Sequence, residues 1–185
     1  QESSDDDVNV ARNDLNGLVH KEVHSGKTPR LIYIGITCGL SAPYVAAQLE
    51  AASKASPEGS VVILIGFNPV ELARKTEIEG WAGHSFHSVV QDLVSNKANL
   101  DSEKHSFHVI NPVYGPESVA GSTRMKGGSV TKIILDVLLG TALHRAEQLI
   151  HSKKALPMEP MIDEVEQFIR HCKPAFDAVY SQELR

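Results

Sequence analysis

The stretch LIYIGITCGLSAPYVAAQLE, residues 31–50, decides the fold of this chain. Its first part, Leu31 to Thr37, is a continuous apolar and β-branched run, which is typical of a strand that is buried on both faces. Its last part carries apolar residues at helical spacing from Pro43 onward. A buried strand followed directly by a helix predicts a βα unit of a parallel sheet, with the loop Thr37–Ala42 at the carboxyl end of the strand.

Two more segments repeat this pattern further along the chain. Residues 61–67, VVILIGF, predict a second buried strand, and residues 105–113 predict a third. Helices are expected at about residues 8–23, 70–73 and 85–94, where apolar side chains recur at helical spacing. The sequence therefore predicts an α/β fold with a parallel sheet, whose strands all deliver their carboxyl ends to one edge. That edge is where open α/β sheets bind ligands.

The third predicted strand leads into a loop whose composition suits an anion. The loop reads GPESVAGSTRMKGG, residues 115–128. Its glycines allow the backbone to approach a ligand closely, and the first N–H groups of a following helix are donors at the positive end of the helix dipole. Hydroxyl groups and the cations Arg124 and Lys126 add charge-assisted hydrogen bonds. The alternative is a solvated turn with a capping serine.

A long apolar run, Ser129 to Ile150, follows this loop and predicts a helix that is apolar on nearly every face. Such a helix is buried in a large core or packs between subunits or domains. Three strands offer little surface to bury it, so we expect part of the sheet to be missing. Residues 153–160 resemble a linker, and residues 160–180 predict a further helix with one apolar face. Residues 1–152 are thus expected to form one domain, and residues 153–185 a linker and helix that lead toward another.

Composition excludes several classes of protein. The chain has 185 residues and a net charge of −5, without a basic run or enough aromatic residues to stack nucleic-acid bases. Its nine histidines are scattered rather than spaced as metal ligands, so neither a metal nor a cofactor is expected. Cys38 and Cys172 lack the spacing of a redox or zinc motif, which fits a reducing compartment. No apolar window is long enough for a membrane span, and a soluble chain is expected.

Three segments resemble the sugar isomerase (SIS) domains that N-acetylmuramic acid 6-phosphate etherases share with glucokinase regulatory proteins. They are GITCGLSAPYVAAQLE at residues 35–50, IGFNPVELAR at residues 65–74 and GPESVAGSTRMKGGSVTKIILD at residues 115–136. The first two look more like the regulatory proteins than the etherases. The resemblance implies a three-layer αβα sheet that lacks its first strands and continues into C-terminal helices.

In SIS domains the ligand is a phosphosugar, held at the carboxyl edge of the sheet by hydroxyl-rich loops. The resemblance implies that the binding residues are Asp5, Thr37, Cys38, Gly39, Leu40, Ser41, Ser122, Thr123, Arg124 and Lys126. Asp5 matches the catalytic glutamate in the EGAED-type segment of the etherases, but it is one methylene shorter, which puts elimination chemistry in doubt. The alternatives are that Asp5 belongs to an ordinary acidic terminus and that Ser41 only caps its helix.

The resemblance also indicates what this chain lacks. The GTSGR-type phosphate loop and the second catalytic glutamate of the etherases are absent, as are a second SIS domain and a helical lid. The chain is therefore expected to be the later part of a first SIS domain with its connecting helix.

The leading hypothesis is a non-catalytic sensor that binds fructose 6-phosphate or fructose 1-phosphate and controls a glucokinase-type hexokinase. A protein of this kind is expected in the cytoplasm, with the nucleus as an alternative, and without nucleic-acid or membrane partners. The alternative from the enzyme class is an etherase that releases lactate from N-acetylmuramic acid 6-phosphate, with Asp5 as its catalytic acid. A third hypothesis is a truncated remnant that forms a homodimer through its apolar helices.

Overall fold

A computed structural model describes residues 7–24, 31–55, 59–95, 105–113, 115–119 and 125–152, together with Arg170 and Pro174. The chain divides into two compact units, residues 1–129 and residues 130–185. The first unit holds the sheet and the predicted ligand loops. The predicted linker at residues 153–160 lies outside the described residues, as does the predicted helix at residues 160–180 except for its two described residues.

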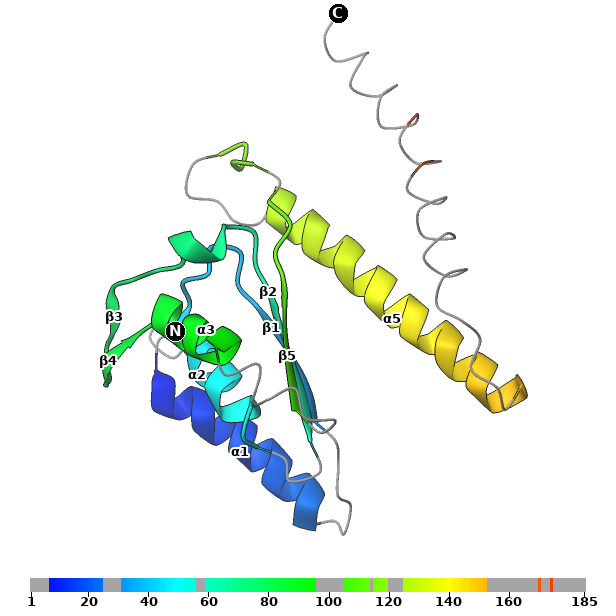
Figure 1. Ribbon diagram of the computed structural model, residues 1–185, viewed down its shortest axis with the longest axis horizontal. Coiled ribbons are helices and arrows are strands. Elements are labelled where there is room, and N and C mark those ends of the chain that lie inside the picture. Colours follow the sequence, from blue (N-terminus) through cyan, green and yellow to red (C-terminus); the bar gives the residue numbers. More distant parts are fainter. Residues whose placement is uncertain are drawn as a thin grey trace, which may run out of the picture. The chain divides into compact units, whose positions relative to one another are not determined.

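The centre of the first unit is a parallel sheet of three strands in the order β1-β2-β5 (Figure 1). The strands are β1 (Leu31–Ile36), β2 (Ser60–Ile65) and β5 (His105–Ile110). Leu31 pairs with Ser60, which in turn pairs with His105, so the strands are aligned end to end. The predicted α/β fold with a parallel sheet is confirmed, and all three carboxyl ends do reach one edge.

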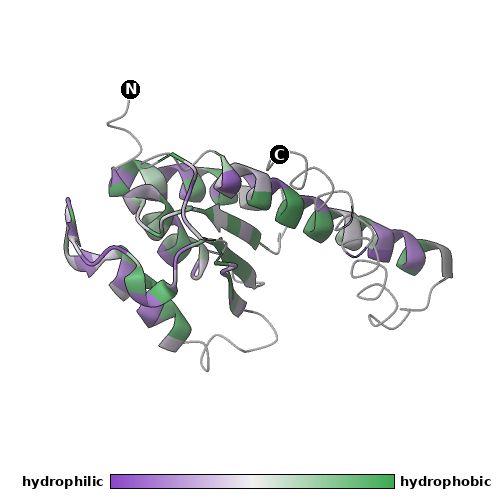
Figure 2. Ribbon diagram, turned by 90° about the horizontal axis from the view of Figure 1, so that it is seen from above, coloured by the Kyte–Doolittle hydropathy of each residue, from purple (hydrophilic) through white to green (hydrophobic). Residues whose placement is uncertain are grey.

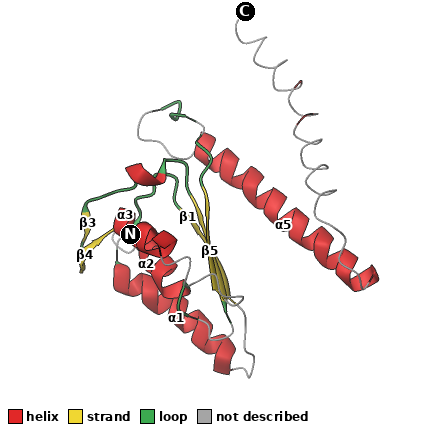
Figure 3. Ribbon diagram, in the orientation of Figure 1, coloured by secondary structure: helices red, strands yellow, loops and turns green. Residues whose placement is uncertain are grey.

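Three helices of the first unit lie on one side of this sheet (Figures 1 and 3). They are α1 (Val8–His24), α2 (Pro43–Ala52) and α3 (Phe86–Ser95), and a short 3₁₀ helix, η2 (Val70–Leu72), follows β2. These bounds agree with the predicted helices to within a few residues. The side chains at the centre of the core are fully buried and come from strands and helices alike: Val62, Leu64, Phe107, Leu49, Phe86 and Val90.

The other face of β1 does not fit the expectation of a strand that is buried on both faces. Ile32 is 66% exposed and Ile36 is 37% exposed, whereas Gly35 on the helix-covered face is buried. The expectation was wrong for β1. A continuous apolar run indicates that a strand tends to be buried, but it does not show that another element packs on each of its faces. Figure 2 shows the apolar character of the sheet strands in green.

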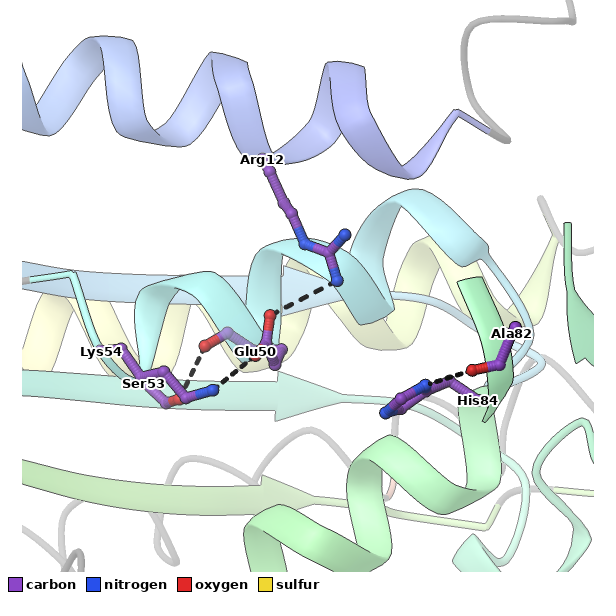
Figure 4. Close-up of polar contacts among 6 residues, drawn as sticks. All are labelled: Arg12, Glu50, Ser53, Lys54, Ala82 and His84. Atoms are coloured by element: carbon purple, nitrogen blue, oxygen red, sulfur yellow. Dashed lines mark hydrogen bonds and ion pairs between the residues drawn. The ribbon is translucent and has the colours of Figure 1, made fainter. Parts of the chain in front are cut away.

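Polar contacts join α1 to α2. The Asp7 carboxylate accepts hydrogen bonds from the N–H groups of Asn9 and Val10 at 2.8 and 3.2 Å, so Asp7 caps α1. Along the helix, the Arg12 guanidinium lies 3.6 Å from the Glu50 carboxylate of α2, which also pairs with Lys54 (Figure 4). The Arg12–Glu50 pair thus joins α1 to α2.

The hairpin of β3 (Glu77–Ile78) and β4 (Trp81–Ser85) was not predicted. Its strands are short and lack a clear alternation of apolar and polar residues. Gly80, between the strands, has a φ of 75°, which glycine adopts without strain. The Trp81 ring packs under the Arg12 guanidinium at 4.2 Å and stacks on His84 at 4.6 Å, so tertiary contacts hold the hairpin in place.

The last long element is α5 (Lys126–Ser152), which begins three residues before the predicted start at Ser129. It carries large exposed apolar side chains: Ile133, Leu139, Leu143, Leu149 and Ile150. Burial of these residues in a large core was therefore wrong, whereas packing between subunits or domains stays a prediction. Among the described helices, none has the length and apolar content to cross a membrane.

Candidate functional site

The candidate site is built on the loop Thr37–Ala42, which leaves the carboxyl end of β1 and enters α2. The Thr37 N–H donates to the Ile65 carbonyl at 3.0 Å, so the sheet ladder extends one residue into the loop. Two further bonds close the turn: the Leu40 N–H donates to the Thr37 carbonyl at 3.2 Å, and the Ser41 N–H to the Thr37 hydroxyl at 3.4 Å. Thr37 is buried, and its hydroxyl therefore has a structural task in shaping this turn.

Leu40 holds the loop against the core. Its side chain is fully buried and its φ is 51°, in the left-handed region that costs a residue with a Cβ about 1–2 kcal/mol. A Cβ atom at Gly66 would lie 2.2 Å from the Leu40 side chain, so the absence of a side chain at Gly66 makes room for it. Leu40 can therefore contact a ligand only through its backbone, which refines its predicted role.

The start of α2 differs from the alternative that Ser41 only caps this helix. The N-cap residue is Ala42, with φ −78° and ψ 115°, and no side chain among the described residues caps this helix. Pro43 occupies the first turn and lacks an N–H. The next N–H groups of α2 lie at the positive end of its dipole, beside Gly39 and the half-buried Ser41. The hydroxyl group of Ser41 is thus not used as the helix cap.

Two asparagines tie the loops after the three strands together. The Asn68 amide donates to the Gly39 carbonyl at 3.3 Å. The Asn111 amide donates to the carbonyl of Gly66 at 2.9 Å and to that of Asn68 at 2.5 Å. Because each asparagine reaches from one strand end to the next, the edge of the sheet is a connected polar network rather than three independent loops.

The loop after β5 is fastened to the start of α5 by Glu117. One carboxylate oxygen accepts from the Lys126 N–H at 2.8 Å and the other from the Gly127 N–H at 2.7 Å. The Lys126 ammonium donates to the Pro116 carbonyl at 2.8 Å. The sequence had suggested the first N–H groups of the following helix as donors to a bound anion, but in this structure Glu117 accepts from the first two of them.

Cys38 is half-buried in the loop after β1. Burial raises the pKa of the Cys38 thiol above its usual value, a backbone hydrogen bond lowers it, and the Glu117 carboxylate raises it further. The hydrogen bonds of Asn68 and Asn111 join the ends of the three strands, so the loop with Thr37, Cys38, Gly39, Leu40 and Ser41 lies at the edge of the sheet from which the chain continues to Lys126.

The remaining predicted site residues, Asp5, Ser122, Thr123 and Arg124, lie outside the described residues. Sequence reasoning missed Glu117, Asn68 and Asn111 as parts of the site. A signal for the asparagines was present, since each precedes a proline: Asn68 directly follows one predicted strand, and Asn111 lies near the end of another. For Glu117 the signal was weaker, because the sequence gives no reason to expect that an acidic residue nine positions before a helix caps that helix.

A shallow cavity of about 370 Å³ opens next to the start of α2. It is lined by Pro43, Arg74 and residues 76–79, which include two glutamates. The Arg74 N–H donates to the Leu40 carbonyl at 3.0 Å, so this wall of the cavity is fixed to the candidate loop.

Comparison with known proteins supplies relatives for most of the chain. Residues 1–53 match the family model of the glucokinase regulatory protein N-terminal SIS domain. The glucokinase regulatory protein of Xenopus laevis is 42% identical over 80% of this chain, and that of Homo sapiens is 38% identical over 91% of it. The chain covers 22% and 24% of these two relatives, so it spans about a quarter of their length.

An N-acetylmuramic acid 6-phosphate etherase of Vibrio vulnificus strain YJ016 is 28% identical over 78% of this chain, which covers 35% of that enzyme. These relatives thus align with most of the chain, and the regulatory proteins share more identical residues. These comparisons confirm the resemblance read from the motifs: over most of its length the chain is similar to SIS-domain proteins of the glucokinase regulatory protein and N-acetylmuramic acid 6-phosphate etherase group, and it is closer to the regulatory proteins.

Proposed function

We propose that this chain is the phosphosugar-binding part of a regulatory protein that binds fructose 6-phosphate or fructose 1-phosphate and controls a glucokinase-type hexokinase. The glucokinase regulatory proteins, at 42% and 38% identity, support this function over that of the etherase, at 28% identity. Because the chain spans only part of those relatives, the ligand and the kinase partner are proposals for the full-length protein.

The start of α2 is the observation that supports a ligand with a phosphate group. A helix whose N-cap residue, Ala42, makes no side-chain cap hydrogen bond among the described residues, and which follows a glycine and a hydroxyl group, is suited to phosphate. Backbone amides and hydroxyls bind phosphate without a large net positive charge, which agrees with a chain of net charge −5. We assign the phosphate to Gly39, Leu40 and Ser41, with Thr37 shaping the turn and Cys38 at its side.

The rest of the proposed site comes from the second loop and from the N-terminus. Ser122, Thr123, Arg124 and Lys126 are proposed to complete the phosphosugar contacts, and Asp5 to accept hydrogen bonds from sugar hydroxyls. Control of a kinase then requires only that the ligand bind two conformations of the protein with different affinity. We place the protein in the cytoplasm, with the nucleus as the alternative.

For the domain organisation, we propose that residues 1–152 form a partial SIS domain. Residues 153–185 then act as a linker and helix toward a second domain. The kinase is bound by the full-length protein, and a homodimer through exposed apolar surface is part of the same proposal.

An etherase is the second candidate, and it is favoured by the 28% identity to the Vibrio vulnificus enzyme. It would cleave the lactyl ether of N-acetylmuramic acid 6-phosphate, with Asp5 in the place of the catalytic glutamate. A general base must reach its proton at hydrogen-bond distance, and the shorter side chain of Asp5 counts against this chemistry.

Thermal-shift titration of the full-length protein tests both candidates. The ligands are fructose 6-phosphate, fructose 1-phosphate and N-acetylmuramic acid 6-phosphate, and released lactate is assayed in parallel. A ligand at about a hundred times its dissociation constant stabilises the native state by about 2.7 kcal/mol, which raises Tm measurably. We expect a response to the fructose phosphates, loss of that response in Ser41→Ala, and no lactate.

Ser95→Ala is the matched control, because Ser95 is an exposed hydroxyl at the end of α3 and takes no part in the proposed site. It should respond to the fructose phosphates like the wild type. A response to the muramic sugar alone, with lactate released, would replace the regulator by the etherase.

A further inference from the structure

Three consecutive carbonyl groups of the loop after β1, at residues 38–40, accept hydrogen bonds from the segment that follows β2. Two of the donors are backbone N–H groups, those of Phe67 and Arg74, each at 3.0 Å. The third donor is the side-chain amide of Asn68, which donates to the Gly39 carbonyl at 3.3 Å. The middle one of these three contacts therefore depends on a side chain and can be removed by a substitution.

The Asn68 contact acts on the most adaptable peptide group of the loop. Gly39 has no Cβ, so the peptide group between Gly39 and Leu40 rotates more easily than its neighbours. This peptide group is held at both ends, because its oxygen accepts from Asn68 and its nitrogen, the Leu40 N–H, donates to the Thr37 carbonyl at 3.2 Å. Loss of the Asn68 amide would release the oxygen end.

Asn111 in turn holds the backbone from which Asn68 extends. Its amide nitrogen carries two N–H donors and makes two bonds, to the Gly66 carbonyl at 2.9 Å and to the Asn68 carbonyl at 2.5 Å. Asn111 is half-buried and directly follows β5, whereas Gly66 and Asn68 follow β2. The contacts thus lead from Asn111 to Asn68 and from Asn68 to Gly39, across the ends of all three strands.

The orientation of the Gly39 carbonyl matters if this loop binds a phosphate group. A carbonyl oxygen carries partial negative charge and repels an anion, whereas a backbone N–H group attracts it. While Asn68 holds the Gly39 oxygen, that oxygen is directed at residue 68. Rotation of the peptide group would redirect its negative end and disturb the arrangement of N–H groups around the ligand.

We propose that Asn111 and Asn68 are positioning residues of the phosphosugar site: Asn111 holds Asn68, and the Asn68 amide keeps the Gly39 carbonyl turned away from the bound phosphate. Neither asparagine touches the ligand, and both act through the loop after β1. This inference rests on the proposed function, since it concerns the same site.

The first test is Asn68→Ala in the full-length protein, with fructose 6-phosphate as the probe. We expect the dissociation constant, measured by calorimetry at a temperature where every variant is folded, to rise about tenfold, which corresponds to about 1.4 kcal/mol. Asn68→Gln keeps an amide donor on a longer side chain, and the exposed position of Asn68 leaves room for it. This conservative variant should recover most of the affinity.

A double-mutant cycle tests the order of the contacts. Asn111→Ala should weaken binding at least as much as Asn68→Ala, because it also removes the bond to Gly66. The variant with both substitutions should bind about as tightly as Asn111→Ala alone, since Asn111 acts through Asn68. Two independent tenfold effects would instead multiply to about a hundredfold.

Amide hydrogen exchange supplies a readout that needs no ligand. The Leu40 N–H belongs to the peptide group that Asn68 holds, so its exchange should be faster in Asn68→Ala and in Asn111→Ala than in the wild type. Asn16→Ala is the matched control, because Asn16 is exposed on α1 and lies outside the loops after the strands. It should keep both the affinity and the slow exchange of Leu40.

The possible results lead to different conclusions. An unchanged dissociation constant in Asn68→Ala would overturn the positioning role, and a hundredfold loss in the double variant would overturn the action of Asn111 through Asn68. If the wild type does not bind fructose 6-phosphate, the proposed function fails and the positioning role fails with it. Faster exchange in the variants would then show that the asparagines hold the loop for structural reasons alone.

Discussion

Leu40 shows how one side chain sets the shape of the candidate loop. The resemblance to SIS domains implied that Leu40 contacts the ligand, yet its side chain is fully buried and its backbone adopts a φ of 51°. Burial of a leucine side chain contributes about 1.5–3 kcal/mol, which offsets the cost of about 1–2 kcal/mol for the left-handed conformation. The loop therefore keeps a strained backbone because an apolar anchor holds it.

Gly66→Ala should displace this anchor. The added Cβ would lie 2.2 Å from a Leu40 methyl carbon and 3.1 Å from the Thr37 carbonyl oxygen. Overpacking of this kind costs about 1–3 kcal/mol, so we expect the free energy of unfolding in urea to fall by that amount. Gly17→Ala is the control, since nothing lies within 4 Å of its added Cβ and alanine favours a helix. Equal stability of Gly66→Ala and the wild type would show that Leu40 moves without cost.

At the scale of elements, a chain of polar contacts links β1 to both of its covering helices. The Tyr33 hydroxyl of β1 donates to the Gln48 side chain of α2 at 3.0 Å, and the Gln48 amide donates to the Ala11 carbonyl of α1 at 3.2 Å. The Tyr44 hydroxyl donates to the Asp14 carboxylate at 2.8 Å. These contacts fix α1 and α2 to each other and to the strand that leads into the site.

The environment of Tyr33 predicts that the folded protein loses stability at alkaline pH. Burial, with a smaller effect of Tyr44, raises the pKa of Tyr33 from 10.0 to about 12. A pKa that is higher in the folded state means that folding favours the protonated phenol, so the stabilisation is complete below pH 10 and is lost as the pH rises from 10 to 12. We expect Tyr33→Phe to lose less stability over this range than the wild type in urea titrations at each pH. Equal losses in the two proteins would contradict this assignment.

At the scale of the whole molecule, each compact unit presents apolar surface of its own. In the first unit, Ile32 and Ile36 of β1 are 66% and 37% exposed. In the second unit, Leu139 and Leu143 of α5 are 56% and 68% exposed. Large apolar side chains that gather on an exposed surface mark sites where a protein binds another chain or a further part of itself.

This surface predicts that the chain of 185 residues associates with itself. Light scattering coupled to size-exclusion chromatography at several concentrations should show a dimer that gains population as the concentration rises. Leu143→Glu adds a charge to the exposed face of α5 and should weaken that dimer, because a charge that must be buried at an interface is costly. Glu147→Gln, an exposed substitution on the same helix, is the control. A monomer at every concentration would refute self-association of this chain.

Much of the fold followed from local patterns. Apolar runs and helical spacing predicted the parallel strands β1, β2 and β5 and the helices α1, α2, α3 and α5, because burial of these side chains is repeated at the period of each element. The β3–β4 hairpin was not predicted, because it depends on the packing of Trp81 against Arg12 and His84. Arg12 is far from Trp81 in the sequence, and His84 gives only a weak local signal.

The candidate site was predictable to a smaller extent. The loop Thr37–Ser41 was placed correctly at the strand edge, because a strand followed by a helix fixes where the connecting loop must lie. The structural roles of single residues in this loop were not predictable. Ala42 instead of Ser41 is the N-cap of α2, and Leu40 faces the core. Such tasks depend on which atoms of distant segments lie within about 3 Å, which spacing along the chain does not specify.

The sequence by itself determined the class of fold, the edge of the sheet that carries the site and the resemblance to SIS domains, because all three depend on local apolar patterns and on motifs that are contiguous in the chain. Only the tertiary structure decided that Glu117 supplies the anion at the start of α5 and that Asn68 and Asn111 join the strand ends. The physical reason is that a hydrogen bond needs both partners at short range, and folding alone brings residues such as Gly39 and Asn68 to that distance.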